Sequence, residues 1–203
     1  HHDPFPNSTS GEGIYKTVDG GASWSKKTRG FVDVDLVSLA VDPSDPNVVY
    51  VGAECSRGIF RSEDGGDTWV FVSGGPERGS WDIGHYTMRL STDSKSSVYM
   101  TGRFGVTRSG DGGRTWEDML MRRHFHGVGI SPHDPRLVFL GTSPRQDPTE
   151  ANDHPGGHIL RSVDGGLTWQ DAGDGFPSGA HTSVYDFAFD AADPSIIYVA
   201  TSS

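Results

Sequence analysis

The sequence predicts an all-β fold built from a repeated unit of four antiparallel strands. An octapeptide of the form Ser/Thr-x-Asp-Gly-Gly-x-Ser/Thr-Trp begins at residues 17, 62, 109 and 162, at intervals of 45, 47 and 53 residues. Intervals of this length are typical of the blades of a β-propeller rather than of helical repeats. The 28 glycines among 203 residues show no three-residue period and indicate many turns between short elements.

A second phrase repeats in step with the octapeptide and supplies the other strands. It runs from residue 41 as Val-Asp-Pro-Ser-Asp-Pro-Asn-Val-Val-Tyr-Val-Gly, and related phrases begin at residues 92, 130 and 189. Each copy is typical of a strand, a turn and a second strand. A short apolar strand such as residues 58–61 follows, and each octapeptide tryptophan opens another strand. The repeat therefore has four strands, A to D, and no helical period.

The octapeptide is interpreted as a structural turn between strands C and D. Its aspartate is expected to accept hydrogen bonds from backbone amides two residues on, its two glycines allow positive φ, and its tryptophan returns into the sheet. The expected role is folding rather than catalysis. The residues assigned this structural role are Asp19, Trp24, Asp64, Trp69, Asp111, Trp116, Asp164 and Trp169.

The chain is expected to form a single propeller region, residues 1–203. The positions of the repeats predict that this region contains enough strands for about four blades. Residues 1–31 supply strands C and D of a first blade, and residues 184–203 supply strands A and B of a last one. Complete blades are expected at residues 32–74, 82–121 and 124–173. We expect part of a larger propeller of seven or more blades. The alternative is a four-bladed ring closed by pairing residues 184–200 with residues 13–27.

Composition excludes several classes of partner. Seventeen Lys and Arg against 27 Asp and Glu give a net charge of −10, so the basic footprint of a nucleic-acid-binding protein is missing. No apolar run approaches 18 residues, so membrane insertion is not expected. The single cysteine, Cys55, excludes an internal disulfide.

Sorting the loops by face separates the regular turns from candidate binding residues. In an antiparallel meander the A-to-B turns and the octapeptides share one face, and the irregular B-to-C and D-to-A loops share the other. Eight of the nine histidines lie in or beside the irregular loops, and only His133 lies on the opposite side. Variable loops on a rigid scaffold commonly carry binding sites. The candidate ligand-binding residues are Trp81, Asp82, His85, Arg103, Arg123, His124, His126 and His181.

Alignment of the four A strands makes finer predictions about their side chains. One set of equivalent positions is expected to form the core between blades, and it comprises Val37, Met88, His126, Tyr185, Leu39, Leu90, Val128 and Phe187. The other set, Ser38, Arg89, Gly127 and Asp186, is expected near the axis, where Arg89 and Asp186 meet water, a ligand or each other.

The octapeptide resembles the Asp-box, also called the BNR repeat, of sialidases, sortilin-type receptors, photosystem assembly factors and xyloglucan-hydrolysing glycosidases. The coupled phrases over residues 13–201 are most similar to the xyloglucanase type and its uncharacterised relatives. This resemblance implies a β-propeller of four-stranded blades, and the shared residues belong to the scaffold. No Phe-Arg-Ile-Pro phrase occurs, so sialidase chemistry is not expected.

Two functions follow as hypotheses. The first is a module that binds a polymer, such as a polysaccharide, or a protein through its loop face, in an extracellular or periplasmic location. The alternative is a fragment of a glycoside hydrolase that resembles the xyloglucanase type. For that alternative Asp82 is the catalytic candidate, because residues 81–85, Trp-Asp-Ile-Gly-His, partly match the Asp-Ile-Gly-Gly context of that family. No cofactor and no metal are expected, and the chain is expected to associate with missing blades or another chain.

Overall fold

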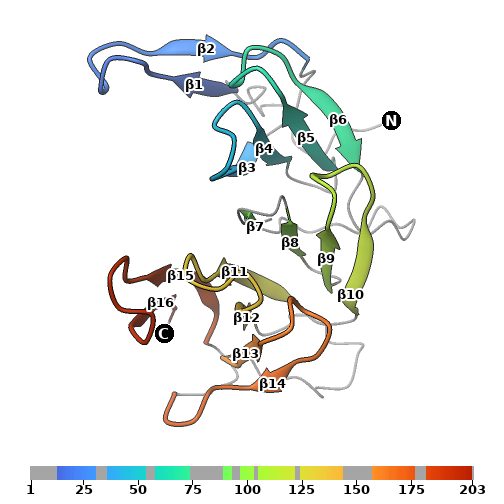
Figure 1. Cartoon of the computed structure of the whole chain (residues 1–203), viewed down its shortest axis with the longest axis vertical. Coiled ribbons are helices and arrows are strands. Elements are labelled where there is room, and N and C mark those ends of the chain that lie inside the picture. Colours follow the sequence, from blue (N-terminus) through green and yellow to red (C-terminus); the bar gives the residue numbers. More distant parts are fainter. Residues whose placement is uncertain are drawn as a thin grey trace, which may run out of the picture.

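The computed structural model describes residues 13–30, 36–53, 58–73, 89–92, 97–102, 105–121, 124–143, 157–176 and 182–202. Within these ranges every regular element is a β-strand, and the strands pair antiparallel in five sheets. Figure 1 shows the sheets following one another along an open arc. The predicted all-β fold with four-stranded antiparallel units is confirmed.

The strands of each sheet follow one another in sequence, so every sheet is a simple meander. The first sheet contains β1 (Ile14–Lys16) and β2 (Ser25–Lys27). The second contains β3 (Leu36–Val41), β4 (Val49–Ala53), β5 (Gly58–Ser62) and β6 (Val70–Ser73). The third contains β7 (Arg89–Thr92), β8 (Val98–Gly102), β9 (Gly105–Ser109) and β10 (Glu117–Met121). The fourth contains β11 (Phe125–Ile130), β12 (Val138–Thr142), β13 (Ile159–Ser162) and β14 (Gln170–Asp171), and the fifth contains β15 (Val184–Phe189) and β16 (Ile197–Thr201).

The hydrophobic core lies between successive sheets. All five residues of β4 and of β12 are buried, as expected for strands that are covered on both faces. The aromatic residue of each second strand packs against the following sheet: Tyr50 clusters with Val98 and Met100, and Tyr99 clusters with Val128 and Ile130. The next residue along the strand faces the preceding sheet, as Val51 does beside Ile14. Alternation along a strand therefore builds two interfaces from one sequence.

The octapeptide turns share one hydrogen-bond pattern. In the turn at residues 62–69, the Ser62 hydroxyl donates to Asp64 Oδ1 at 2.8 Å and accepts from the Gly66 amide at 2.8 Å. The Thr68 amide donates to Asp64 Oδ1 at 2.8 Å, and the Thr68 hydroxyl donates to Oδ2 at 2.6 Å. Gly65 and Gly66 have φ of 68° and 94°, which glycine adopts without strain. The aspartate thus accepts a hydrogen bond from the amide four residues further along the chain. The prediction that the donor would be the amide two residues on is wrong.

The octapeptide tryptophans lie in unequal surroundings. Trp69 is only 4% exposed and packs beside Val49, Val51 and the first sheet, whereas Trp24 is 61% exposed. Trp116 and Trp169 are partly buried against the preceding sheet. A tryptophan in this turn is therefore covered by the sheet that precedes its own.

The first and fifth sheets are separate two-stranded sheets in the described part of the chain. They lie at opposite ends of the arc in Figure 1. The four-bladed ring in which residues 184–200 pair with residues 13–27 is therefore not formed. Among the described residues there is also no helix of the length and apolarity needed to cross a membrane.

Candidate functional site

The strands of the sheets have two ends. We call the end that carries the octapeptides and the A-to-B turns the turn end, and we call the opposite end the loop end. At the turn end, the octapeptide amides of Gly65 and Gly165 donate to the carbonyls of Asn47 and Arg136 in the A-to-B turns, each at 2.9 Å. At the loop end, where β11 and β15 begin and β12 and β16 finish, the Ser143 amide donates to the His124 carbonyl at 3.0 Å and the Ser202 amide to the Ser183 carbonyl at 2.9 Å. His133 lies at the turn end, where its Nε2 is 2.8 Å from the Asp190 carbonyl oxygen.

Three side chains from neighbouring sheets meet at the loop end and form the candidate site, which we call the His-Tyr cluster: His124, His126 and Tyr185. The ring centroids of His124 and His126 are 4.4 Å apart with the planes at 84°, an edge-to-face contact. The rings of His126 and Tyr185 are stacked, with centroids 5.2 Å apart and planes at 16°. His124 is buried, whereas His126 and Tyr185 are half-buried and reach solvent.

Bulges in the A strands orient two of these rings. In β11 the pairing passes from Phe125↔Thr142 to Gly127↔Gly141, so His126 has no directly opposite residue. In β15 it passes from Val184↔Thr201 to Asp186↔Ala200, which leaves Tyr185 at the equivalent position. A bulge turns its extra residue out of the regular alternation. The repeated bulge therefore places His126 and Tyr185 side by side.

Close approach of the fourth and fifth sheets brings the stacked rings together. A Cβ atom added to Gly127 would lie 3.1 Å from the Tyr185 carbonyl carbon, and one added to Gly141 would lie 2.3 Å from Val184 Cγ1. Only a residue without a side chain permits this spacing. The Ser143 and Ser183 hydroxyls, both buried, bond across the same junction at 2.6 Å. The junction is therefore fixed by packing and by a hydrogen bond.

The chemistry available to the His-Tyr cluster is recognition by ring faces and polar ring atoms. Imidazole and phenol rings present apolar faces together with groups that donate or accept hydrogen bonds. A zinc site of the usual kind needs three or four ligands from His, Cys, Asp or Glu. Within the described ranges no group of three such residues is close enough to hold a metal ion.

The structure brings together two of the predicted ligand-binding residues, His124 and His126. The other predicted residues, Trp81, Asp82, His85, Arg103, Arg123 and His181, lie outside the described residues. Tyr185 was expected only in the core between blades, and the structure adds it to the candidate site. The sequence did contain a signal for Tyr185, because Tyr185 aligns with His126 in the repeat. Equivalent positions of a repeat share local structure, so a bulge at His126 predicts a bulge at Tyr185.

Of the two charged residues predicted near the axis, Arg89 and Asp186, the structure describes the side chain of Asp186. Asp186 is exposed, and its Oδ1 accepts a hydrogen bond from the Phe187 amide at 2.9 Å. The side chain of Arg89 lies outside the described atoms. The expected inter-blade core at the neighbouring position is present for Val128 and Phe187, which are buried, but Leu39 is 52% exposed.

The chain is similar in sequence to curated xyloglucanases. It is 28% identical over 193 residues to a xyloglucanase from a Paenibacillus species, a match that covers 79% of this chain and 18% of the relative. It is 24% identical over 208 residues to a probable oligoxyloglucan-reducing end-specific xyloglucanase from Neosartorya fischeri, covering 80% of this chain and 24% of that protein. The chain thus spans less than a quarter of the length of these relatives. No protein-family model matches it.

Solved structures show the same fold. The crystal structure of the GH74 xyloglucanase from Xanthomonas campestris matches with a TM-score of 0.69 at 17% identity, covering 94% of this chain and 32% of that one. The GH74 enzyme from Niastella koreensis matches with a TM-score of 0.61 at 20% identity, covering 82% and 26%. The resemblance to xyloglucanase-type propellers is confirmed in both sequence and fold.

Proposed function

We propose that this chain is part of a xyloglucan-hydrolysing β-propeller and that its loop end binds the polysaccharide. The similarity to curated xyloglucanases over about four fifths of the chain supports this reading. It favours the glycosidase alternative over a module that only binds. A polysaccharide such as xyloglucan does not cross a membrane unaided, and this supports an extracellular or periplasmic location for the protein.

The observation that carries the proposal is the stacked pair of His126 and Tyr185 at the loop end. The two rings come from different sheets, stack on one another and are both half-buried, so part of each residue remains accessible at the loop end. Binding sites combine apolar and aromatic walls with a few placed polar groups. A sugar residue presents apolar C–H faces edged by hydroxyls, which suits such a surface.

The remaining predicted ligand-binding residues extend this proposal. Arg123 precedes His124 directly in sequence, and His181 lies two residues before Ser183. Both therefore connect to strands that begin at the loop end. Asp82 is the proposed catalytic carboxylate, and hydrolysis of a glycosidic bond requires a second carboxylic acid across the cleft.

Binding of soluble xyloglucan, measured by affinity electrophoresis and calorimetry, tests the proposal. Tyr185→Ala and His126→Ala should each weaken binding about tenfold, which corresponds to about 1.4 kcal/mol of lost aromatic contact. Tyr185→Phe should keep most of the affinity, because the ring remains. The matched control is His133→Ala at the turn end, which should bind as the wild type does. Unchanged affinity in both Ala variants would remove the His-Tyr cluster from the binding surface.

Hydrolysis is tested separately by release of reducing ends from xyloglucan. If Asp82 is catalytic, activity of the chain should fall by at least a hundredfold in Asp82→Asn while xyloglucan binding remains. Equal rates in the wild type and the Asn variant would exclude Asp82.

A further inference from the structure

The fourth sheet departs from the repeat at the start of strand C, at the loop end. Four residues before the octapeptide, the first three repeats have Gly13, Gly58 and Gly105, with φ of 93°, 90° and 149°. The fourth repeat has His158 at this position, and its positive φ, 79°, falls one residue earlier at Gly157. Because glycine is needed where φ is positive, this shift allows a side chain at the position that glycine occupies in the other three repeats.

The His158 side chain pairs with a carboxylate on the neighbouring strand. Its Nδ1 lies 3.0 Å from Asp171 Oδ2, and Asp171 Oδ1 accepts a hydrogen bond from the Gly173 amide at 2.8 Å. The backbone of His158 is held as well, because its amide donates to the Thr142 hydroxyl at 2.9 Å. The side chains of His158 and Asp171 are 32% and 59% exposed. The pair is therefore fixed in orientation and still reaches solvent.

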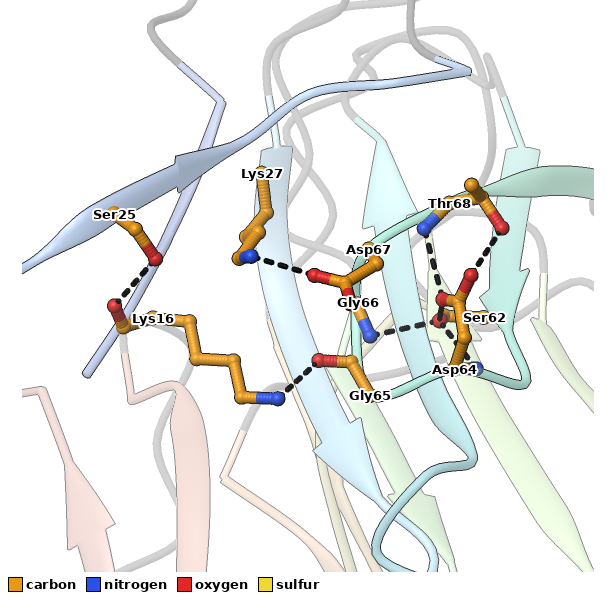
Figure 2. Close-up of polar contacts among 9 residues, drawn as sticks. All are labelled: Lys16, Ser25, Lys27, Ser62, Asp64, Gly65, Gly66, Asp67 and Thr68. Carbon is orange, nitrogen blue, oxygen red and sulfur yellow. Dashed lines mark hydrogen bonds and ion pairs between the residues drawn. The ribbon is translucent and has the colours of Figure 1, made fainter. Parts of the chain in front are cut away.

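This pair is not needed to hold the sheet together. His158 directly precedes β13 and Asp171 ends β14, and the backbones of these two strands already pair at Leu160↔Asp171. At the turn end, by contrast, the Lys27–Asp67 ion pair joins the first sheet to the second at 2.5 Å, as Figure 2 shows. An exposed ion pair within one sheet contributes little to stability. The fold alone therefore gives no strong reason for the His158–Asp171 pair.

The pair lies level with the His-Tyr cluster on the fourth sheet. Phe125, which stands between His124 and His126, is paired with Thr142, and the Thr142 amide donates to the His158 carbonyl at 3.0 Å. The three paired residues thus stand side by side on three successive strands. With about 4.8 Å between neighbouring strands, the backbone of His158 lies roughly 10 Å outward from that of Phe125. A chain of linked sugars can span this separation.

The chemistry of the pair suits the hydroxyl groups of a neutral ligand. A carboxylate only accepts hydrogen bonds, so the neutral imidazole of His158 keeps its proton on Nδ1 for Asp171 and presents Nε2 as an acceptor. A sugar hydroxyl is a donor that fits such acceptors. The negative charge of Asp171 and the net charge of −10 disfavour an anionic ligand.

We propose that His158 and Asp171 form a second sugar subsite at the loop end, outward from the His-Tyr cluster. This inference rests on the proposed function, in which the loop end binds a neutral polysaccharide. It extends the binding surface from the innermost strand of the fourth sheet to its two outer strands. The polysaccharide would then contact the His-Tyr cluster with one part of its chain and this pair with another.

Binding of soluble xyloglucan, measured by calorimetry, tests the subsite. His158→Gly introduces the residue of the other repeats and should weaken binding about tenfold through the lost hydrogen bond. Its thermal midpoint should stay that of the wild type, because the pair adds little stability. Asp171→Asn should also weaken binding. The matched control is Asp118→Asn, at the same repeat position in the third sheet, where the residue is exposed and strand C starts with Gly105. It should bind as the wild type does.

The outcomes separate the subsite from the proposed function. If Tyr185→Ala weakens binding but His158→Gly binds as tightly as the wild type, the subsite is refuted and binding at the loop end stands. If the wild type does not bind xyloglucan, the proposed function is overturned and the subsite with it. Equal losses in Asp118→Asn and Asp171→Asn would also overturn the subsite, because they would reflect a general effect of charge.

Nuclear magnetic resonance observes the imidazole directly. The ring signals of His158, identified by their absence from the spectrum of His158→Gly, should shift when xyloglucan oligosaccharides are added to the wild type. The ring signals of His133 at the turn end are the internal control and should not shift. Unmoved His158 signals at a saturating oligosaccharide concentration would show that the pair does not contact the sugar and would overturn the proposal.

Discussion

Each octapeptide aspartate binds both ends of its own turn. The hydroxyl of Thr68 donates to Asp64, as do the Thr68 amide and the Ser62 hydroxyl, and these donors lower the pKa of Asp64 to about 2. The pKa values of Asp19 and Asp164 are also lowered to about 2 by equivalent donors, and that of Asp111 is lowered too. The ionised carboxylate is thus the form that the folded turn requires.

Acid should therefore destabilise the protein through these turns. A carboxyl with a folded pKa of about 2 and an unfolded value of about 3.9 stabilises the fold above pH 4 and loses this contribution as the pH falls towards 2. Asp64→Asn should lower the thermal midpoint at pH 7 and make the loss between pH 4 and 2 shallower. The control is Asp174→Asn, an exposed residue outside the octapeptides, which should keep the thermal midpoint and the acid profile of the wild type. Parallel acid profiles for the wild type and Asp64→Asn would contradict the argument.

A second residue-scale prediction concerns Gly141. A Cβ atom there would lie 2.3 Å from Val184 Cγ1 and 2.7 Å from the Val184 carbonyl oxygen. Gly141→Ala should therefore cost about 1 to 3 kcal/mol by forcing the fourth and fifth sheets apart. It should also weaken xyloglucan binding, because it separates His126 from Tyr185. Gly102→Ala is the control, because a Cβ atom there meets no other atom within 4 Å and the residue has no positive φ, so neither a clash nor backbone strain is expected. Full stability of Gly141→Ala would show that the junction yields easily.

At the scale of the element, the position of a turn within the arc determines how much its tryptophan contributes. Trp69 is buried against the first sheet, whereas Trp24 lies on the first sheet itself and is exposed. Trp69→Ala should cost about 3 to 5 kcal/mol in the free energy of unfolding. Trp24→Ala should change it by about 0.5 kcal/mol or less, as exposed substitutions usually do. Denaturant melts of the two variants check this, and equal losses would refute it.

The same contrast shows what the sequence could predict. The octapeptides and their coupled phrase predicted the antiparallel four-stranded units and the positions of the turns, because the conformation of a turn depends mainly on the few residues within it. The burial of Trp24 or Leu39 depends on a neighbouring sheet, which no local pattern describes. In the candidate site, residue type and loop position indicated His124 and His126. The role of Tyr185 depends on a bulge, and alternation of apolar residues does not reveal one.

At the scale of the whole molecule, the sheets form a linear series in which the core is divided among successive junctions. A middle sheet therefore has two apolar interfaces, and a terminal sheet has one. In repeat proteins of this kind, stability is approximately the sum of each unit and its nearest-neighbour interfaces. Stability should accordingly fall from the middle of the arc towards its ends.

Amide hydrogen exchange can measure this gradient directly. The amides of β8 and β12 should exchange slowest, because these strands are buried and are hydrogen-bonded to a neighbouring strand on both sides. Those of β1 and β2 should exchange at least a hundredfold faster, because a two-stranded sheet is marginally stable by itself and opens without disturbing the rest. Uniform protection across all sheets would instead mean that the arc opens only as a single cooperative unit.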